Sequence, residues 1–447
     1  CEPAQREPCF WDAGWLQGAQ QHRTFPSDHR PVVATLQPPG APQIGPKRWR
    51  FPNHMLGQQA LTDQLKEALT TAAAQLQQRS PRLDPAAEWE ALKDSAKAAA
   101  QQLHSQLRQE QQAQARQLRQ QVAAARRLTQ IEPGAQALQD LLRAEQALTD
   151  FETARLQREA AATEPLWEVY GETSAYWFHR LGRAAQEPQL IAGIQRQDGS
   201  LVRAEGREGV AEVGGLLADY YDPATAGLFS LRPTDPQQQH EMLAAIDKPL
   251  DDQGQQQCRG PQADGSITEA EALEALRSLP RGKSPGSDGL TYEFYTAMWD
   301  VVGGPLVAAF NYSFEQPQLR LSERQRLGLV TLIYKGGGKP RADPASYRPI
   351  TLLNCDLKII AKVLVRRFGP ALGGIIDGTQ TAFIPGRDIA DNVLLHLEEI
   401  DYVQHVGDEG CIVFLDFEKA YDRLDREWLF QCMGAMGFPD SSMRWVR

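Results

Sequence analysis

The chain has 447 residues, of which 42% are hydrophobic and 23% charged, so it is long enough for about three domains and too apolar to be disordered throughout. Lys and Arg number 47 and Asp and Glu number 57, which gives a formal net charge of −10. That balance excludes a uniformly basic nucleic-acid coat but permits a local basic groove. No apolar run approaches the roughly 18 residues that span a bilayer, so a membrane protein is excluded.

The cysteine pattern argues against a zinc site and against a disulfide framework. The six cysteines are scattered and contain no Cys-x-x-Cys pair, which favours a reducing compartment. The sequence begins with Cys1 and carries no signal peptide, which predicts a piece of a longer protein.

The first two predicted units differ in composition. Residues 1–56 are rich in Pro, Trp and Arg. Pro38-Pro39-Gly40, near the middle of this stretch, is typical of the end of a folded unit, so residues 1–40 are predicted to be the first unit. Residues 41–185 are predicted to be a helical linker, because the 33 residues from Ser95 to Arg127 include 9 Ala and 10 Gln. Large apolar residues are sparse there, which favours a solvated helical spacer or hairpin; a coiled-coil partner site is the alternative.

Residues 186–265 change character. Asp198-Gly199 lies between two apolar runs and predicts a β-hairpin, because Gly accepts a positive φ and Asp tolerates one. The polar, Gln-rich stretch from Asp247 to Asp264 is predicted to be a mobile loop.

Residues 266–447 are predicted to be a mixed α and β domain. Ser266 to Glu269 is predicted to be a capping box that opens a helix. Strands are predicted over 327–334 and 411–415, and helices over 356–368 and 425–436. Phe383 and Ile384 are expected in the core.

Charge separates two surfaces within this domain. From Arg320 to Pro370 there are 11 basic residues against three acidic ones, a local net of +8, whereas His396 to Glu427 holds ten acids against three bases. This arrangement suits a protein that grips phosphates and places carboxylates near them, although two ordinary solvated faces of opposite sign give the same pattern.

Asp416 follows the apolar run Cys411-Ile-Val-Phe-Leu415, so it is predicted to stand at the carboxyl end of a buried strand. A carboxylate on such rigid backbone suits a Mg²⁺ ligand. Strand-final Asp residues occur in many folds, and Asp422 and Asp425 are more typical of a turn and a helix cap.

The basic segment contains Lys335-Gly-Gly-Gly-Lys339-Pro340, in which three glycines would let backbone amides approach a polyphosphate. It is not a Walker loop, because Lys339 is followed by Pro340. Arg348 precedes Pro349, which favours extended backbone and a fixed direction for a guanidinium that can bind phosphate bidentately. A flexible hairpin tip with exposed cations is the alternative interpretation.

The order of these motifs resembles the reverse transcriptase of LINE-type, non-LTR retrotransposons. The blocks that carry the resemblance are Lys283-Ser-Pro-Gly-Ser-Asp-Gly289, Glu293-Phe-Tyr295, Leu332-Ile-Tyr-Lys335, Tyr347-Arg-Pro-Ile-Thr-Leu-Leu353, Gln380-Thr-Ala-Phe-Ile-Pro-Gly-Arg387, Asp391-Asn392 and Phe414-Leu-Asp-Phe-Glu-Lys-Ala-Tyr-Asp422. The resemblance implies an α+β fold in which a long helical linker and the pre-polymerase segment 186–265 precede 266–447, the reverse-transcriptase fingers and the start of a right-hand palm.

The resemblance also implies a role for individual residues. Asp416 matches the catalytic aspartate of the family and, with the Phe417 carbonyl, would be a ligand of Mg²⁺. Arg348, and less directly Lys335, hold the triphosphate, and Tyr421 packs under the incoming sugar. Gln380 and Arg387 contact the template. The implied partners are an RNA template, a DNA primer or target and deoxynucleoside triphosphates, with action in the nucleus; no specific protein partner is implied.

Residues 25–32, Phe-Pro-Ser-Asp28-His29-Arg-Pro-Val, resemble the strand that ends an apurinic-type endonuclease domain. In such domains His acts at the scissile phosphate and Asp orients it, so residues 1–40 are expected to be an endonuclease remnant.

The predicted palm is incomplete. Only 31 residues follow Asp416, too few for the Asp-Asp hairpin that supplies further metal-binding carboxylates. One aspartate cannot hold two divalent ions, so this chain alone is expected not to synthesise DNA. A non-catalytic RNA-binding module and a decayed retroelement product are the alternatives.

Overall fold

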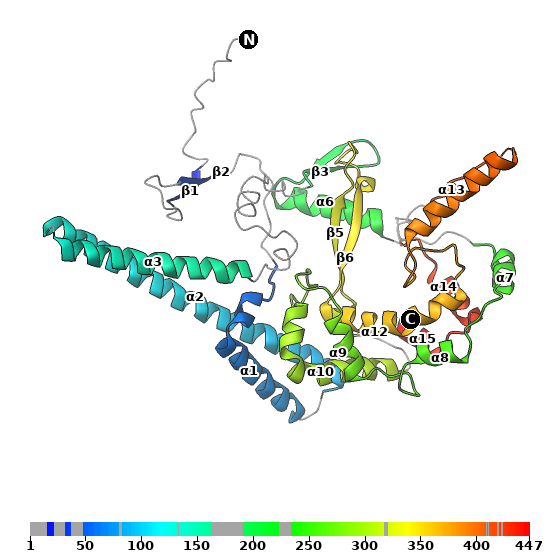
Figure 1. The fold of residues 1–447 in the computed structure, drawn as a ribbon, viewed down its shortest axis with the longest axis horizontal. Coiled ribbons are helices and arrows are strands. Elements are labelled where there is room, and N and C mark those ends of the chain that lie inside the picture. Colours follow the sequence, from blue (N-terminus) through cyan, green and yellow to red (C-terminus); the bar gives the residue numbers. More distant parts are fainter. Residues whose placement is uncertain are drawn as a thin grey trace, which may run out of the picture.

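The structure is a computed structural model, and it describes residues 16–21, 32–36, 48–79, 83–132, 134–161, 191–222, 234–316, 321–407, 409, 411–417, 420–421 and 423–447. The strands of these residues form three separate antiparallel pairs: β1 (Leu16–Gln21) with β2 (Val32–Leu36), β3 (Gly193–Gln195) with β4 (Leu201–Arg203), and β5 (Leu329–Tyr334) with β6 (Tyr347–Leu352). Helices make up most of the remainder, so the fold is α+β, as the sequence predicts (Figure 1).

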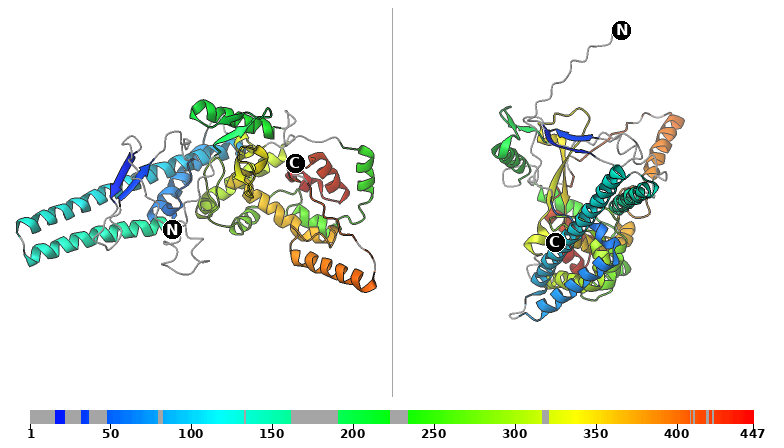
Figure 2. Two further views of the ribbon diagram at one scale, coloured as in Figure 1. Left: turned by 90° about the horizontal axis from the view of Figure 1, so that it is seen from above. Right: turned by 90° about the vertical axis from the view of Figure 1, so that its left-hand side faces the viewer.

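The N-terminal helices are α1 (Gln59–Gln77), α2 (Pro85–Ile131) and α3 (Ala135–Ala161). Pro85 begins α2 rather than interrupting it, because the Asp84 side chain caps the helix by accepting from the Ala87 amide at 2.7 Å and a proline fits the first turn. Helix α2 ends at Ile131 and α3 begins at Ala135. The two helices form an antiparallel hairpin whose far end projects away from the rest of the chain (Figures 1 and 2).

The main core joins the first half of this hairpin to the C-terminal helices. Residues of α1 and α2, including Leu69 and Trp89, are buried in one cluster with α9 (Glu269–Arg277), α10 (Tyr292–Glu315) and α12 (Cys355–Ile375). The largest fully buried side chains of this cluster are Trp89, Tyr295, Phe51, Phe294 and Phe310. Burial of each such ring stabilises the fold by about 2 kcal/mol, so α1 and the start of α2 are integral to the core.

The hairpin predicted around Asp198-Gly199 is confirmed. Gly199 has φ +86°, and the Asp198 carboxylate accepts from the Ser200 amide at 2.9 Å. This hairpin packs on α6 (Gly206–Tyr221) around a small core of Ile194, Val202 and Val213.

The prediction of a mobile loop from residue 247 to residue 264 is wrong. After α7 (Pro236–Ala244), the segment contains α8 (Asp252–Arg259), because Asp251 caps it by accepting from the Gly254 amide at 2.7 Å. Cys258 and Leu250 are buried there beside α12 and α14. The capping box predicted at 266–269 lies two residues later, between Thr268 and Glu271 at the start of α9.

The remaining helices of the described residues are α11 (Glu323–Arg326), α13 (Ile389–Val406), α14 (Arg426–Ala435) and α15 (Asp440–Val446). The predicted cap at Asp425 is confirmed, since its carboxylate accepts from the Glu427 amide at 2.9 Å. The predicted strand 327–334 and helix 356–368 are confirmed as β5 and α12. Among the described residues, no helix has both the length and the hydrophobicity needed to cross a bilayer.

Candidate functional site

The predicted phosphate-binding segment is the β5–β6 hairpin, which rises from the helical body toward β3 and α6 (Figure 1). The strands pair in a regular antiparallel register, in which Ile333 lies opposite Arg348 and Tyr334 opposite Tyr347. Beyond the strands, the Lys335 amide donates to the Ser346 carbonyl at 2.9 Å and extends the ladder by one step. The hairpin therefore carries Arg348 on rigid backbone close to its tip.

The tip is organised by aromatic side chains and glycines. The Tyr347 hydroxyl donates to the Arg341 carbonyl at 2.6 Å, and the Arg341 guanidinium lies 4.7 Å from the centre of the Tyr334 ring. Gly336, Gly337 and Gly338 all have φ near +70°, a conformation in which a Cβ would be strained. A Cβ at any of the three would meet no atom within 4 Å, so this part of the loop is open.

The two predicted phosphate-binding cations differ in their surroundings. Arg348 is exposed, and the structure gives its side chain no hydrogen bond or ion pair with another described residue. The Lys335 ammonium instead donates to the Ala345 carbonyl at 2.6 Å and is half-buried. Arg348 is thus available to a ligand, whereas Lys335 braces the tip.

The predicted template-contacting residues lie in the turn between α12 and α13. The Arg387 guanidinium donates to the carbonyls of Ile376 at 2.8 Å, Gln380 at 2.7 Å and Gly373 at 3.2 Å, and also to that of Asp377. It therefore satisfies the carbonyl end of α12 and shapes the turn. The Gln380 side chain donates within the turn, to the Ala382 carbonyl at 3.1 Å.

Phe383 is not a core residue, and its predicted burial is wrong. Its side chain is 85% exposed, and its φ of +66° lies in the left-handed region that residues other than glycine rarely adopt. Its ring centre lies 6.3 Å from that of Tyr421, which is 79% exposed. Two exposed aromatic rings therefore lie next to each other, Phe383 from the turn and Tyr421 from the segment before α14, and the sequence motif gave no sign of this pair.

The strand predicted over 411–415 is absent, and the Asp416 side chain is exposed rather than at the end of a buried strand. Residues 411–417 have no strand pairing, and Phe414, Leu415 and Phe417 are more than four-fifths exposed. A lone strand is not stable without neighbours, and among the described residues none pairs with this segment.

The described residues also do not assemble a metal site around Asp416. No group of three or more His, Cys, Asp or Glu side chains suited to holding a metal ion is found among them. The two predicted endonuclease residues, Asp28 and His29, lie outside the described residues.

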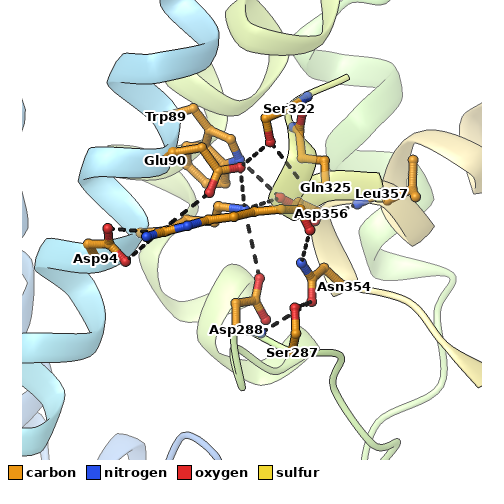
Figure 3. A network of polar contacts seen from close by, with 12 residues as sticks. Trp89, Glu90, Asp94, Ser287, Asp288, Ser322, Gln325, Asn354, Asp356 and Leu357 are labelled. Atoms are coloured by element: carbon orange, nitrogen blue, oxygen red, sulfur yellow. Dashed lines mark hydrogen bonds and ion pairs between the residues drawn. The ribbon is translucent and has the colours of Figure 1, made fainter. Parts of the chain in front are cut away.

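A buried charged network lies beneath the 283–289 motif, and the sequence reasoning missed it (Figure 3). The Lys93 ammonium lies 2.9 Å from Asp356 Oδ2, 3.0 Å from Glu90 Oε1 and 3.9 Å from Asp288 Oδ2. The Trp89 indole N–H also donates to Asp356 Oδ2, at 3.0 Å. One ammonium thus faces three carboxylates, and it joins α2 to the motif and to the start of α12.

Burial governs the ionisation of this network. It raises the pKa of Asp288 to about 7, helped by the nearby Asp356 charge and opposed by Lys93. Burial lowers the pKa of Lys93, but the carboxylates of Asp356, Glu90 and Asp288 outweigh it and raise the value above 10.5. Lys93 is therefore charged at neutral pH, while Asp288 titrates near neutrality.

Close packing explains both glycines of the motif. A Cβ on Gly286 would lie 2.3 Å from Asn354 Oδ1, and one on Gly289, which has φ +78°, would lie 2.4 Å from the Trp49 carbonyl. Asn354 Oδ1 accepts from the Ser287 hydroxyl and the Asp288 amide, both at 3.2 Å (Figure 3). The loop 283–289 is a structural junction, and its Lys283 side chain is left exposed.

Comparisons with known proteins match the C-terminal part of the chain. Residues 334–447 match the family described as reverse transcriptase, an RNA-dependent DNA polymerase. The chain is 36% identical over 172 residues to the transposon TX1 uncharacterized 149 kDa protein of Xenopus laevis, a match that covers 38% of this chain and 13% of that protein. It is 30% identical over 158 residues to the probable RNA-directed DNA polymerase from transposon BS of Drosophila melanogaster, covering 34% of this chain and 17% of that protein.

A third relative is the retrovirus-related Pol polyprotein from type-1 retrotransposable element R1 of Bradysia coprophila. The two proteins are 27% identical over 165 residues, a match that covers 36% of this chain and 15% of that protein. The matched part of the chain thus spans less than a fifth of the length of each of these relatives.

Proposed function

Residues 334–447 are part of a LINE-type, non-LTR retrotransposon reverse transcriptase, and on that premise we propose that this chain supplies the nucleotide-holding fingers of an RNA-directed DNA polymerase. The observation that carries the proposal is the exposed Arg348 on the paired β5–β6 hairpin, next to an open glycine tip. A guanidinium binds phosphate oxygens bidentately, and glycine backbone amides add donors for a polyphosphate.

The exposed aromatic pair supports the same proposal. Base stacking on aromatic rings stabilises single-stranded nucleic acid by about 1–3 kcal/mol per base. The rings of Phe383 and Tyr421 are exposed and adjacent, at the turn that Arg387 shapes. We assign Tyr421 to the incoming nucleotide, and the turn from Gln380 to Arg387, with Phe383, to the RNA template strand.

Reverse transcriptases use divalent metal ions, and we propose Mg²⁺ with the Asp416 carboxylate and the Phe417 carbonyl as its ligands. Among the described residues, no group of three or more metal-binding side chains surrounds Asp416, so they do not make a complete site. We expect the 447-residue chain by itself to bind nucleotide and template but not to extend a primer.

A non-catalytic RNA-binding role is the second candidate, and the incomplete metal site favours it. Primer extension separates the two. Incorporation of nucleotides into a DNA primer on an RNA template by this chain would refute the expectation of inactivity, and loss of that incorporation in Asp416→Asn would assign the chemistry to Asp416.

Equilibrium binding of a deoxynucleoside triphosphate tests the proposal. Arg348→Ala should weaken binding about tenfold or more, since hydrogen bonds to charged groups contribute roughly 1.5–3 kcal/mol. Arg348→Lys should recover only part of the affinity, because an ammonium lacks the bidentate geometry. Arg143, exposed on α3, is the matched control, and equal binding by Arg348→Ala and Arg143→Ala would overturn the assignment.

A further inference from the structure

Three cations from three separate parts of the chain lie beside the 283–289 motif, which adds a fourth, Lys283. The Arg50 guanidinium donates to the Lys283 carbonyl at 3.5 Å, and the Lys358 ammonium donates to the Ser284 carbonyl at 3.2 Å. Lys97 of α2 lies 5.4 Å from the centre of the Trp49 ring. We define Arg50, Lys97, Lys283 and Lys358 as the junction patch.

Further contacts hold these parts together. The Phe51 amide donates to the Gly289 carbonyl at 2.9 Å, and Gly289 packs against Trp49. Arg50 and Lys283 are exposed, and Lys97 and Lys358 are half-buried, so their charges reach the surface. Arg48 and Arg281, which are also exposed, flank the patch in the sequence.

The nearby acids do not neutralise the patch. Glu293 accepts from the Gly282 amide at 2.6 Å and contributes one negative charge against the four cations. The Asp288 carboxylate points instead toward the buried Lys93. The carboxylates of Asp356 and Glu90 likewise face Lys93. The patch therefore keeps a net positive charge.

We infer that the junction patch binds the phosphate backbone of a single nucleic-acid strand. Closely spaced cations beside a partly exposed tryptophan are typical of surfaces that hold single strands, with phosphates on the cations and a base against the ring. Lys358 lies in the first turn of α12, just beyond the base of β6, and Arg348 lies near the other end of that strand. Four residues of a β-strand span about 13 Å, so one bound nucleic-acid strand can run from the β5–β6 hairpin to the junction patch.

This inference rests on the proposed function, because it takes the chain to handle nucleic acid. It differs from that function in its residues, since none of the four cations belongs to the β5–β6 hairpin or to the turn from Gln380 to Arg387. The proposed function and the inference about the junction patch can therefore be refuted separately.

The test is the salt dependence of binding to a labelled 20-nucleotide RNA and to a DNA of the same sequence, measured by fluorescence anisotropy on the full chain. The triple variant Arg50→Gln, Lys283→Gln, Lys358→Gln keeps Lys97, which packs on Trp49. Each lost phosphate contact reduces the slope of log affinity against log salt by about 0.7, so the triple variant should reduce it by about 2. Similar losses for RNA and DNA assign the patch to the phosphate backbone, and a larger loss for RNA adds a contact to the 2′-hydroxyl.

The control is a second triple variant that removes the same charge from the α2–α3 hairpin: Arg116→Gln, Arg127→Gln, Arg143→Gln, all at exposed positions. It should leave the slope unchanged, and thermal unfolding of both variants checks that each is folded. Equal slopes for the two variants would overturn the inference. Polyglutamate serves as a polyanion that is not a nucleic acid. The inference would also be overturned if the junction variant lost binding to polyglutamate but kept its binding to RNA. If the junction variant binds RNA normally while Arg348→Ala still loses the nucleotide, the proposed function stands without the patch.

Discussion

Replacement of Lys93 by methionine tests whether the buried network holds the N-terminal helices to the polymerase-like part of the chain. Lys93 is 4% exposed and is within 3.0 Å of carboxylate oxygens of both Glu90 and Asp356, the latter fully buried. Methionine keeps much of the side-chain volume but removes the ammonium. Breaking a buried ion pair from one side costs about 3–5 kcal/mol, because the remaining charges stay buried without compensation.

Such a loss is a large fraction of the roughly 5–15 kcal/mol that holds a domain folded. Urea unfolding at pH 7.5 measures it, with tryptophan fluorescence as the signal, since Trp89 is buried beside Lys93. Addition of Asp288→Asn to Lys93→Met should recover part of the stability, because it removes one of the uncompensated carboxylates.

Lys66 provides the control. Its ammonium lies 2.9 Å from Asp300 Oδ2, but the two side chains are 33% and 61% exposed. Exposed pairs contribute at most about 1 kcal/mol, so Lys66→Met should change the free energy of unfolding by less than that. A Lys93→Met variant that unfolds within 1 kcal/mol of Lys66→Met would refute the reasoning.

Three further predictions concern the junction, α12 and the aromatic turn. The pKa of Asp288 is raised from 3.8 to about 7 in the folded chain, so its contribution to stability is full below about pH 4 and is lost as pH rises toward 7. Asp288→Asn removes this loss, and urea unfolding at pH 5 and pH 8 should show a larger gain in the variant at pH 8 than at pH 5; equal gains at both pH values would contradict the assignment. Gly260→Ala should destabilise the chain by about 2 kcal/mol or more in thermal unfolding, because the new Cβ would lie 2.4 Å from the Arg367 guanidinium at a residue with φ +88°. Phe383→Gly should raise the free energy of unfolding by about 1 kcal/mol by relieving the positive φ, yet weaken binding of a primed RNA template measured by anisotropy. Unchanged template binding in that variant would exclude a stacking role for Phe383.

Local sequence rules predicted the elements whose signals are local. Helix α12 follows from its apolar spacing, the β3–β4 turn from Asp198-Gly199, and the start of α14 from the cap at Asp425. Helix α8 was missed because its Gln-rich composition outweighed the capping signal of Asp251, which is an equally local feature.

The parts that were missed depend on distant residues. The hydrogen bond between Lys93 and Asp356 joins residues 263 apart in the sequence, and no periodicity within either helix indicates it. The apolar run 411–415 has the composition of a strand, but a strand also needs a neighbour to pair with. Phe383 was expected in the core because it is apolar, whereas its backbone conformation and the Arg387 contacts that shape the turn place it at the surface.

The site was predicted in outline rather than in its contacts. The motif order located Arg348, Gln380, Arg387 and Asp416, and their roles toward nucleotide, template and metal stay predictions. The motif did not indicate that the guanidinium of Arg387 is occupied by backbone carbonyls while that of Arg348 is exposed, because these differences arise from how the hairpin and the turn fold.

Photo-crosslinking of an azido deoxynucleoside triphosphate, with the labelled peptides mapped by mass spectrometry, tests the central claim most directly. In the presence of primed RNA, the account predicts label in the hairpin peptide that contains residues 335–348 and in the segment around Tyr421, with both signals lost on addition of unlabelled nucleotide. Label confined to the α2–α3 hairpin, or hairpin label that unlabelled nucleotide does not displace, would contradict it.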